Sequence, residues 1–159
     1  MSAARVHFAL DDRVVVVTGA ARGIGAACAR RLVADGAAVA LWDVDDTAGR
    51  ALAAELAAAG ARTHYCHCDV ARKSEVDAAL AATLAAFGRV DGLVNNAGIF
   101  RAAEFLDITE ADWDAVIAVN LKGAFLVGQA TARVMAAAGR GAIVNMSSVN
   151  GVLTIATLA

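Results

Sequence analysis

The chain has 159 residues, the length of one domain, and a formal net charge of −2. This charge excludes the strongly basic balance typical of nucleic-acid binders, so no nucleic-acid partner is expected. No run of about 20 apolar residues predicts a membrane span, and we expect no secretory signal. The odd number of cysteines, three, then favours free thiols in a reducing compartment, and so a cytoplasmic protein.

Short apolar runs alternate with helical patterns from residue 13 onward. In chain order they predict a strand at 13–18, a helix from Ile24 to Gly36, a strand at 37–42, a helix over 48–60, a weaker strand at 63–68, a helix over 76–88, a strand at 90–94, a long helix from Thr109 to near Gly139, and a strand at 142–146. Strict alternation implies parallel strands joined by right-handed crossovers. The predicted fold class is therefore α/β, a doubly wound parallel sheet of Rossmann-like type that stops after its fifth strand. Such sheets bind ligands beyond the carboxyl ends of their strands.

Two of these helices carry apolar stripes that we expect to face the core. The stripes are Ile24, Cys28 and Leu32 in the first helix and Trp113, Ile117, Leu121 and Phe125 in the long one. Residues at this spacing share one face of a helix. Trp113 is accordingly predicted to be a core contact and not a platform for a ligand.

A glycine-rich segment, TGAARGIG at 18–25, follows the first strand directly. Glycine lets the backbone turn sharply and approach a ligand closely, and the start of the next helix offers free N–H groups to an anion. A dinucleotide pyrophosphate is the expected ligand. The spacing departs from GxGxxG, and the absence of a following Lys-Ser/Thr disfavours a Walker-type loop. Packing alone also explains glycines at many helix starts.

Asp43 ends the second predicted strand, where a carboxylate can accept hydrogen bonds from the adenosine ribose hydroxyls. Together with Asp45 and Asp46 it would repel a 2′-phosphate, so NAD is favoured over NADP. Arg22 in the glycine loop is the opposing signal, because a cation there could pair with that phosphate. Alternatively, Asp43 and Asp46 only cap the second helix.

Five spaced motifs together resemble the short-chain dehydrogenase/reductase family. They are the loop Thr18–Gly25, the pair Asp69-Val70, the run Asn95-Asn96-Ala97-Gly98, Asn120 between Val119 and Leu121, and the segment 143–148 with Ser147 and Ser148. The resemblance runs from residue 13 to the last residue. It implies an incomplete NAD-binding domain at 13–159, preceded by an N-terminal extension at 1–12.

The resemblance implies a role for each motif in hydride transfer between nicotinamide and a secondary alcohol or ketone. Cofactor-binding residues would be Gly19, Arg22, Gly23, Ile24, Gly25, Asp43, Asp69, Val70, Asn96, Ala97 and Gly98. Ser148 would polarise the substrate carbonyl, and Asn120 would position a water. Read without the family, Ser148 is an ordinary turn residue after a strand, and Asn120 satisfies a local bend of its helix.

The proton donor of the family, a Tyr assisted by a Lys, would fall just past Ala159. Tyr65 is the one tyrosine of the chain and lies on the third predicted strand, so it is no substitute. We therefore expect this chain alone to be inactive. Two alternatives stay open: a non-catalytic NAD-binding module or pseudoenzyme that ends here, and a truncated relic. Because the sheet ends on an uncovered edge, the isolated chain is expected to aggregate or to need a partner.

Two further features bear on metal binding and on association with a second copy. His64, Cys66, His67 and Cys68 lack the CxxC-type spacing of structural zinc sites, so no metal is expected. Gly123 and Gly128 would let the long helix pack closely against another helix. Since this helix helps to form the dimer in the family, the full-length form is expected to be a homo-oligomer.

Overall fold

The computed structural model describes residues 8–149, and its elements follow the predicted order. They are β1 (Val14–Thr18), α1 (Gly23–Ala34), β2 (Ala38–Asp43), α2 (Asp46–Ala58), β3 (Thr63–His67), α3 (Lys73–Phe87), β4 (Gly92–Asn95), η1 (Phe105–Asp107), α4 (Glu110–Val116), η2 (Ile117–Gly123), α5 (Ala124–Ala137) and β5 (Ala142–Asn145). Residues 1–7 of the predicted extension and residues 150–159 of the predicted domain lie outside the described residues.

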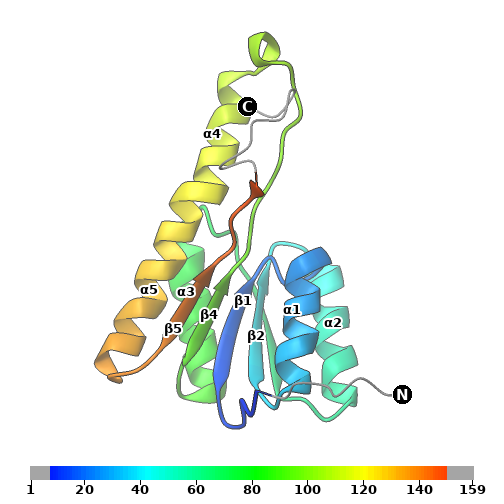
Figure 1. Cartoon of the computed structure of the whole chain (residues 1–159), viewed down its shortest axis with the longest axis vertical. Coiled ribbons are helices and arrows are strands. Elements are labelled where there is room, and N and C mark those ends of the chain that lie inside the picture. Colours follow the sequence, from blue (N-terminus) through cyan, green and yellow to red (C-terminus); the bar gives the residue numbers. More distant parts are fainter. Residues whose placement is uncertain (1–7, 150–159) are drawn as a thin grey trace.

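The strands form one parallel sheet in the order β3-β2-β1-β4-β5, which confirms the predicted fold class. Helices α1 and α2 cover one face of this sheet, and α3 and α5 cover the other (Figure 1). From β1 the chain builds outward to β3, and it then returns to place β4 on the other side of β1. At such a reversal the chain leaves neighbouring strands toward opposite faces, which opens a crevice at their carboxyl ends.

The sheet is held between two apolar layers. Every residue of β1 is buried, as expected for a parallel strand that is covered on both faces. Val15 and Val17 face α1 and α2, whereas Val16 faces α3 and α5, because successive side chains of a strand point to opposite faces. In the apolar layer between the sheet and helices α3 and α5, the buried Trp42 donates its indole N–H to Thr83 Oγ1 over 2.9 Å.

One helical segment, 110–137, runs through α4, the π-helical η2 and α5, and it contradicts part of the prediction. Thr109 caps the start of this segment, since Thr109 Oγ1 accepts the Asp112 N–H over 3.1 Å. However, the segment projects beyond the sheet, and only its second half packs on the strands (Figure 1). The buried residues of α5 are Val127, Thr131 and Met135.

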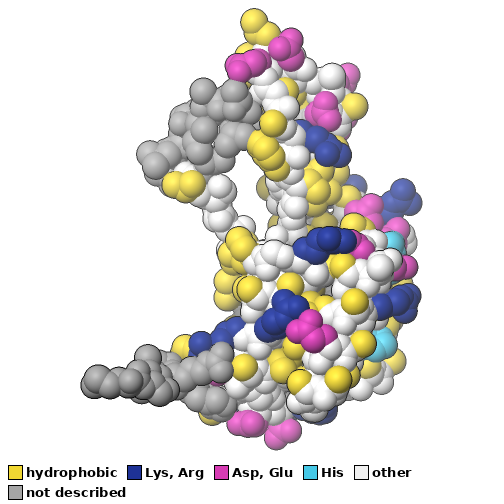
Figure 2. Space-filling model, turned by 90° about the vertical axis from the view of Figure 1, so that its right-hand side faces the viewer, with side chains coloured by type: hydrophobic (Ala, Val, Ile, Leu, Met, Phe, Trp, Pro, Cys, Tyr) yellow, Lys and Arg dark blue, Asp and Glu magenta, His cyan; other side chains and the backbone are white. Residues whose placement is uncertain are grey.

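The predicted stripe of this segment is therefore exposed, and its assignment to the core was wrong. The exposed side chains are Trp113, Ile117, Leu121 and Phe125. Trp113 itself is 55% exposed, because the sheet does not extend to the part of the helix that carries it. Figure 2 shows hydrophobic side chains on this projecting part of the molecule. By length and composition alone the segment could also cross a membrane, but α5 packs its apolar face on β4.

The stripe predicted for α1 was wrong at one position. Ile24 is 62% exposed, and the buried residues of the helix are Gly25, Ala26 and Ala29. Small side chains let this helix approach the sheet closely, so its core face is set by them and not by the larger Ile24. The exposed Ile24 lies instead at the carboxyl edge of the sheet.

The outer strand β5 is exposed at all four residues. Ile143 and Val144 are 39% and 54% exposed, so the uncovered apolar edge that the sequence predicts is present within the described residues. Whether this edge causes aggregation stays a prediction.

A carboxylate is buried at the amino end of the sheet. The Asp91 side chain is 8% exposed, and it accepts the Val14 N–H over 2.9 Å and lies 3.4 Å from Arg140. Burial alone would raise the pKa of Asp91, but hydrogen bonds from Arg89 and from the Val14 amide outweigh it, so the pKa lies below its ordinary value.

We expect Asp91→Asn to lower the free energy of unfolding by about 1–3 kcal/mol at neutral pH, because the buried carboxylate loses its charge-assisted hydrogen bonds with the Val14 amide and the Arg89 guanidinium. A lowered folded-state pKa adds stability above the unfolded value of about 3.9, and this stability is lost as the pH falls through the folded value. The difference between wild type and variant should therefore shrink in urea unfolding below about pH 4. Asp77→Asn, on the surface of α3, is the control. A difference that does not change with pH would contradict the prediction.

Candidate functional site

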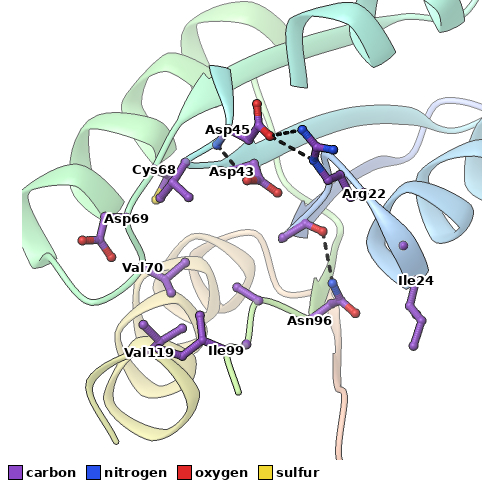
Figure 3. Close-up of a pocket in the computed structure, with 15 residues that line it drawn as sticks. Arg22, Ile24, Asp43, Asp45, Cys68, Asp69, Val70, Asn96, Ile99 and Val119 are labelled. Atoms are coloured by element: carbon purple, nitrogen blue, oxygen red, sulfur yellow. Dashed lines mark hydrogen bonds and ion pairs between the residues drawn. The ribbon is translucent and has the colours of Figure 1, made fainter. Parts of the chain in front are cut away.

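A cavity of about 520 Å³ opens at the carboxyl ends of the strands, beside the reversal between β1 and β4 (Figure 3). Ten of the residues predicted to bind a cofactor line it: Gly19, Arg22, Gly23, Ile24, Asp43, Asp69, Val70, Asn96, Ala97 and Gly98. Val44, Asp45, Cys68, Ile99 and Val119 line it as well and were not among the residues predicted to bind the cofactor. The structure thus brings together four separate loops that the sequence places after successive strands.

One buried hydroxyl joins the glycine loop to the segment after β4. Thr18 Oγ1 accepts the N–H groups of Asn96 and Ala97, each over 2.9 Å. In return, Asn96 Nδ2 donates to the carbonyl oxygens of Thr18 and Gly19 over 3.0 and 3.3 Å. The sequence placed Thr18 in the glycine-loop motif but did not predict this bridging role. The signal was a single polar residue at the end of an all-valine strand, which needs a buried partner.

The three glycines of the loop, Gly19, Gly23 and Gly25, are needed for different reasons. Gly19 has φ +62° and Gly23 φ +53°, a left-handed backbone that favours glycine. Gly25 does not line the cavity. A Cβ atom there would lie 2.0 Å from the Gly19 carbonyl oxygen and 2.7 Å from Asn96 Nδ2, so Gly25 lets α1 pack against the loop from behind.

The Asp43 carboxylate is held in place by two backbone amides. Its Oδ2 accepts the Ala21 N–H over 2.8 Å, and its Oδ1 accepts the Asp45 N–H over 2.9 Å. An ionised carboxylate offers about four lone-pair sites, so acceptor capacity remains toward the cavity. Figure 3 shows this carboxylate between the loops that follow β1 and β2.

The capping alternative for Asp43 is wrong. Asp45 is the cap residue of α2, and its Oδ1 accepts the Ala48 N–H over 2.9 Å. Asp46 lies in the first turn of α2 and contacts His67 Nδ1 at 2.8 Å. Asp43 therefore does not cap α2, and its carboxylate lines the cavity.

Arg22 and Asp45 form an ion pair beside this carboxylate. Arg22 Nε and Nη2 lie 2.9 and 2.5 Å from Asp45 Oδ2 (Figure 3). The Ala48 amide and then the Arg22 guanidinium hold the pKa of Asp45 below its usual value. The cation that opposed the choice of NAD is thus already paired with a carboxylate of the protein.

Tyr65 makes structural hydrogen bonds and does not line the cavity. Its hydroxyl lies 2.8 Å from both the Asp43 carbonyl oxygen and Asp46 Oδ1. Burial, followed by the Asp46 hydrogen bond, raises the pKa of this phenol well above its ordinary value, opposite to the needs of a proton donor near neutral pH. The structure therefore supports the expectation that Tyr65 does not replace the family's tyrosine.

The three cysteines are free thiols. Burial raises the pKa of the Cys68 thiol to about 12 and also raises that of Cys66, so both remain protonated. Within residues 8–149 no three His, Cys, Asp or Glu side chains gather in a way that could hold a metal ion.

The two residues predicted to be catalytic lie outside the cavity lining. Asn120, in the π-helical η2, accepts the Ile99 N–H at Oδ1 over 2.8 Å and donates from Nδ2 to the Ile99 carbonyl over 2.9 Å. This contact fastens the segment after β4 to the long helix. Ser148 follows the carboxyl end of β5 and is exposed. Their roles in catalysis stay predictions.

The sequence of the chain matches the family model described as short chain dehydrogenase over residues 13–159. The chain belongs to the short chain dehydrogenase family. It is 46% identical over 141 residues to the D-threitol dehydrogenase of Mycolicibacterium smegmatis, which covers 89% of this chain and 54% of that protein. Over 142 residues it is 42% identical to the 3-alpha-(or 20-beta)-hydroxysteroid dehydrogenase of Mycobacterium tuberculosis, with the same two coverages. This short chain dehydrogenase sequence thus spans about half the length of the curated relatives it matches.

Solved structures of similar proteins have the same fold. A short chain dehydrogenase/reductase from Burkholderia phymatum, in complex with NAD, is 35% identical with a TM-score of 0.91, covering 95% of this chain and 54% of that chain. Levodione reductase is 37% identical with a TM-score of 0.89, covering 94% of this chain and 59% of that chain. The described fold is therefore that of the family.

We expect Gly25→Ala to destabilise the chain by about 1–3 kcal/mol, because its Cβ would force the Gly19 carbonyl out of the loop. Gly128→Ala is the matched control. Gly128 also lies in a helix, but its Cβ would come no closer than 3.9 Å to another side chain, so that variant should gain about 0.5–1 kcal/mol from helix propensity. Thermal or urea unfolding measures both changes, and equal effects of the two variants would refute the steric argument.

Proposed function

We propose that this chain is the cofactor-binding part of an NAD-dependent oxidoreductase, which moves a hydride between nicotinamide and a secondary alcohol or ketone. The observation that carries the proposal is the Asp43 carboxylate, which faces the same cavity as the glycine loop. Relatives named for D-threitol and for a hydroxysteroid support an alcohol or ketone as the substrate. The NAD complex of a structural neighbour supports the choice of cofactor.

The start of α1 fits a pyrophosphate. Its cap residue, Arg22, makes no side-chain hydrogen bond to the first N–H groups of the helix, and the first turn holds no acidic residue. Such a helix start leaves donors and a positive dipole end for an anion. A Cβ built on Gly23 meets no atom within 4 Å, so the space in front of the loop is open. In the proposed complex the pyrophosphate lies against Gly19, Gly23 and Ile24.

The other lining residues divide the rest of the dinucleotide among them. Asp43 accepts the hydroxyls of the adenosine ribose through its remaining lone pairs, and Asp69 and Val70 hold the adenine. Asn96 and its two following residues, Ala97 and Gly98, lie at the nicotinamide side, where Asn96 keeps the glycine loop in position. When bound, the cofactor supplies the hydride chemistry, and these residues bind and orient it.

The catalytic groups proposed for this part of the protein are few. Ser148 donates a hydrogen bond to the substrate carbonyl and stabilises the charge that develops there. Asn120 holds the segment after β4 and positions a water for the proton path. The tyrosine and lysine that complete the family's proton transfer are proposed to lie in a longer form of the protein, which we place in the cytoplasm.

A homo-oligomer of the longer form is part of the proposal. The exposed stripe of Trp113, Ile117, Leu121 and Phe125 supports it, since large apolar side chains at one spacing on a projecting helix favour association with a second copy.

We expect NAD to bind the chain, and Asp43→Asn to weaken that binding about tenfold, because hydrogen bonds to an ionised carboxylate are lost. Isothermal titration calorimetry of both proteins with NAD measures the change. Asp77→Asn removes the same charge from the distant surface of α3 and should leave the Kd unchanged. No binding by the wild-type chain would overturn the proposal.

In the protein expressed from the longer reading frame, we expect Ser148→Ala to lower kcat about 100-fold or more toward secondary alcohols. Ser147→Ala, one residue earlier, is the matched control and should keep kcat close to that of the wild type. A longer protein that binds NAD but turns over no alcohol or ketone would favour the non-catalytic module instead.

A further inference from the structure

The ion pair between Arg22 and Asp45 joins the starts of two helices across the cavity. Arg22 is the cap residue of α1 and Asp45 that of α2. Both guanidinium contacts, at 2.9 and 2.5 Å, go to Asp45 Oδ2, while Asp45 Oδ1 accepts the Ala48 N–H over 2.9 Å. Each oxygen of Asp45 therefore has its own partner, and both residues line the cavity (Figure 3).

The pair lies next to the carboxylate proposed to hold the ribose. The N–H of Asp45 donates to Asp43 Oδ1, and the N–H of Ala21, the neighbour of Arg22, donates to Asp43 Oδ2. The backbone of Asp45 and that of Ala21, which precedes Arg22, are thus each hydrogen-bonded to one oxygen of the Asp43 carboxylate. A 2′-phosphate on a ribose bound by Asp43 would enter the reach of the Arg22 side chain, which is suited to bind phosphate through two hydrogen bonds.

We propose that Asp45 is a positioning residue for cofactor specificity, which holds the Arg22 guanidinium in an ion pair and withholds it from the 2′-phosphate of NADP. The inference rests on the proposed function. To bind NADP, the protein would have to break this pair and leave the Asp45 carboxylate beside the phosphate. NAD, which has a hydroxyl there, requires no such step.

The ion pair between Arg22 and Asp45 contributes little to the stability of the fold, so it can be removed without unfolding the protein. The Arg22 side chain is 76% exposed and that of Asp45 31% exposed, and exposed ion pairs contribute little to stability. Removing it should therefore change the choice of cofactor and not the fold.

The experiment compares the Kd values of NAD and NADP, by isothermal titration calorimetry, for the wild-type chain and for Asp45→Asn. Asparagine is also a good helix cap, so α2 keeps its start while the ion pair loses its charge. We expect NADP to bind about tenfold more tightly to the variant, and NAD to change by less than about twofold. Asp45→Ser is a second variant, which also caps a helix but is too short to reach Arg22.

Two controls separate the ion pair from the general loss of negative charge. Asp46→Asn removes the same charge one residue further along, from a carboxylate that contacts Tyr65 and His67 and not Arg22. It should alter NADP binding less than about twofold. In the double variant Arg22→Ala/Asp45→Asn the gain in NADP affinity should vanish, since Asp45 acts through Arg22.

The outcomes are distinct. If Asp46→Asn favours NADP as much as Asp45→Asn does, or if the gain survives without Arg22, repulsion by charge is the cause and the inference is overturned. If NAD binds but neither Asp45 variant changes the Kd of NADP, the inference alone fails. If the wild-type chain binds neither dinucleotide, the proposed function fails with it.

Discussion

Hydrogen bonds between the ends of β1 and β4 hold the cavity together. At the reversal of strand order the segments that leave β1 and β4 turn to opposite faces of the sheet. Backbone groups at the ends of these two strands therefore have no partner in the neighbouring strand and need other hydrogen-bond partners. The Thr18 hydroxyl and the Asn96 amide supply them. Asn95 extends the same network, because its Nδ2 donates to the Ala124 carbonyl at 2.8 Å and to Asn145 Oδ1 at 3.1 Å. Glycine loop, long helix and β5 are thus tied to one junction.

The starts of α1 and α2 differ in how they are capped, and this difference determines the electrostatics of the cavity. The start of α2 is closed by the Asp45 carboxylate, whereas the start of α1 carries an arginine and lacks such a cap among the described residues. One positive dipole end is therefore neutralised within the protein, and the other is left to a ligand. The ion pair between Arg22 and Asp45 connects the two helix starts. It places a paired cation beside the Asp43 carboxylate.

The long helix shows how a site wall is built outside the core. Its first half projects past the sheet, and the wider turn of η2 lies where Asn120 faces the backbone of Ile99. The bidentate contact orders the segment after β4, which would otherwise have no strand to pair with. Ile99 and Val119 can then line the cavity. Asn120, a helix residue outside the cavity lining, thus holds in place Ile99, which lines the cavity.

The sequence by itself determined the order of the strands and α-helices, because buried parallel strands and helices have different apolar periods, and it located the glycine loop and Asp43 at strand ends. It did not predict the short turn η1 or the π-helical η2. Only the tertiary structure decided which helix faces are buried. A stripe such as the one with Trp113 looks the same whether or not a sheet lies beneath it. The partners of Thr18 and Arg22 were also beyond the sequence, since they lie 78 and 23 residues away. Contacts of that separation depend on how strands are ordered, which no local pattern records.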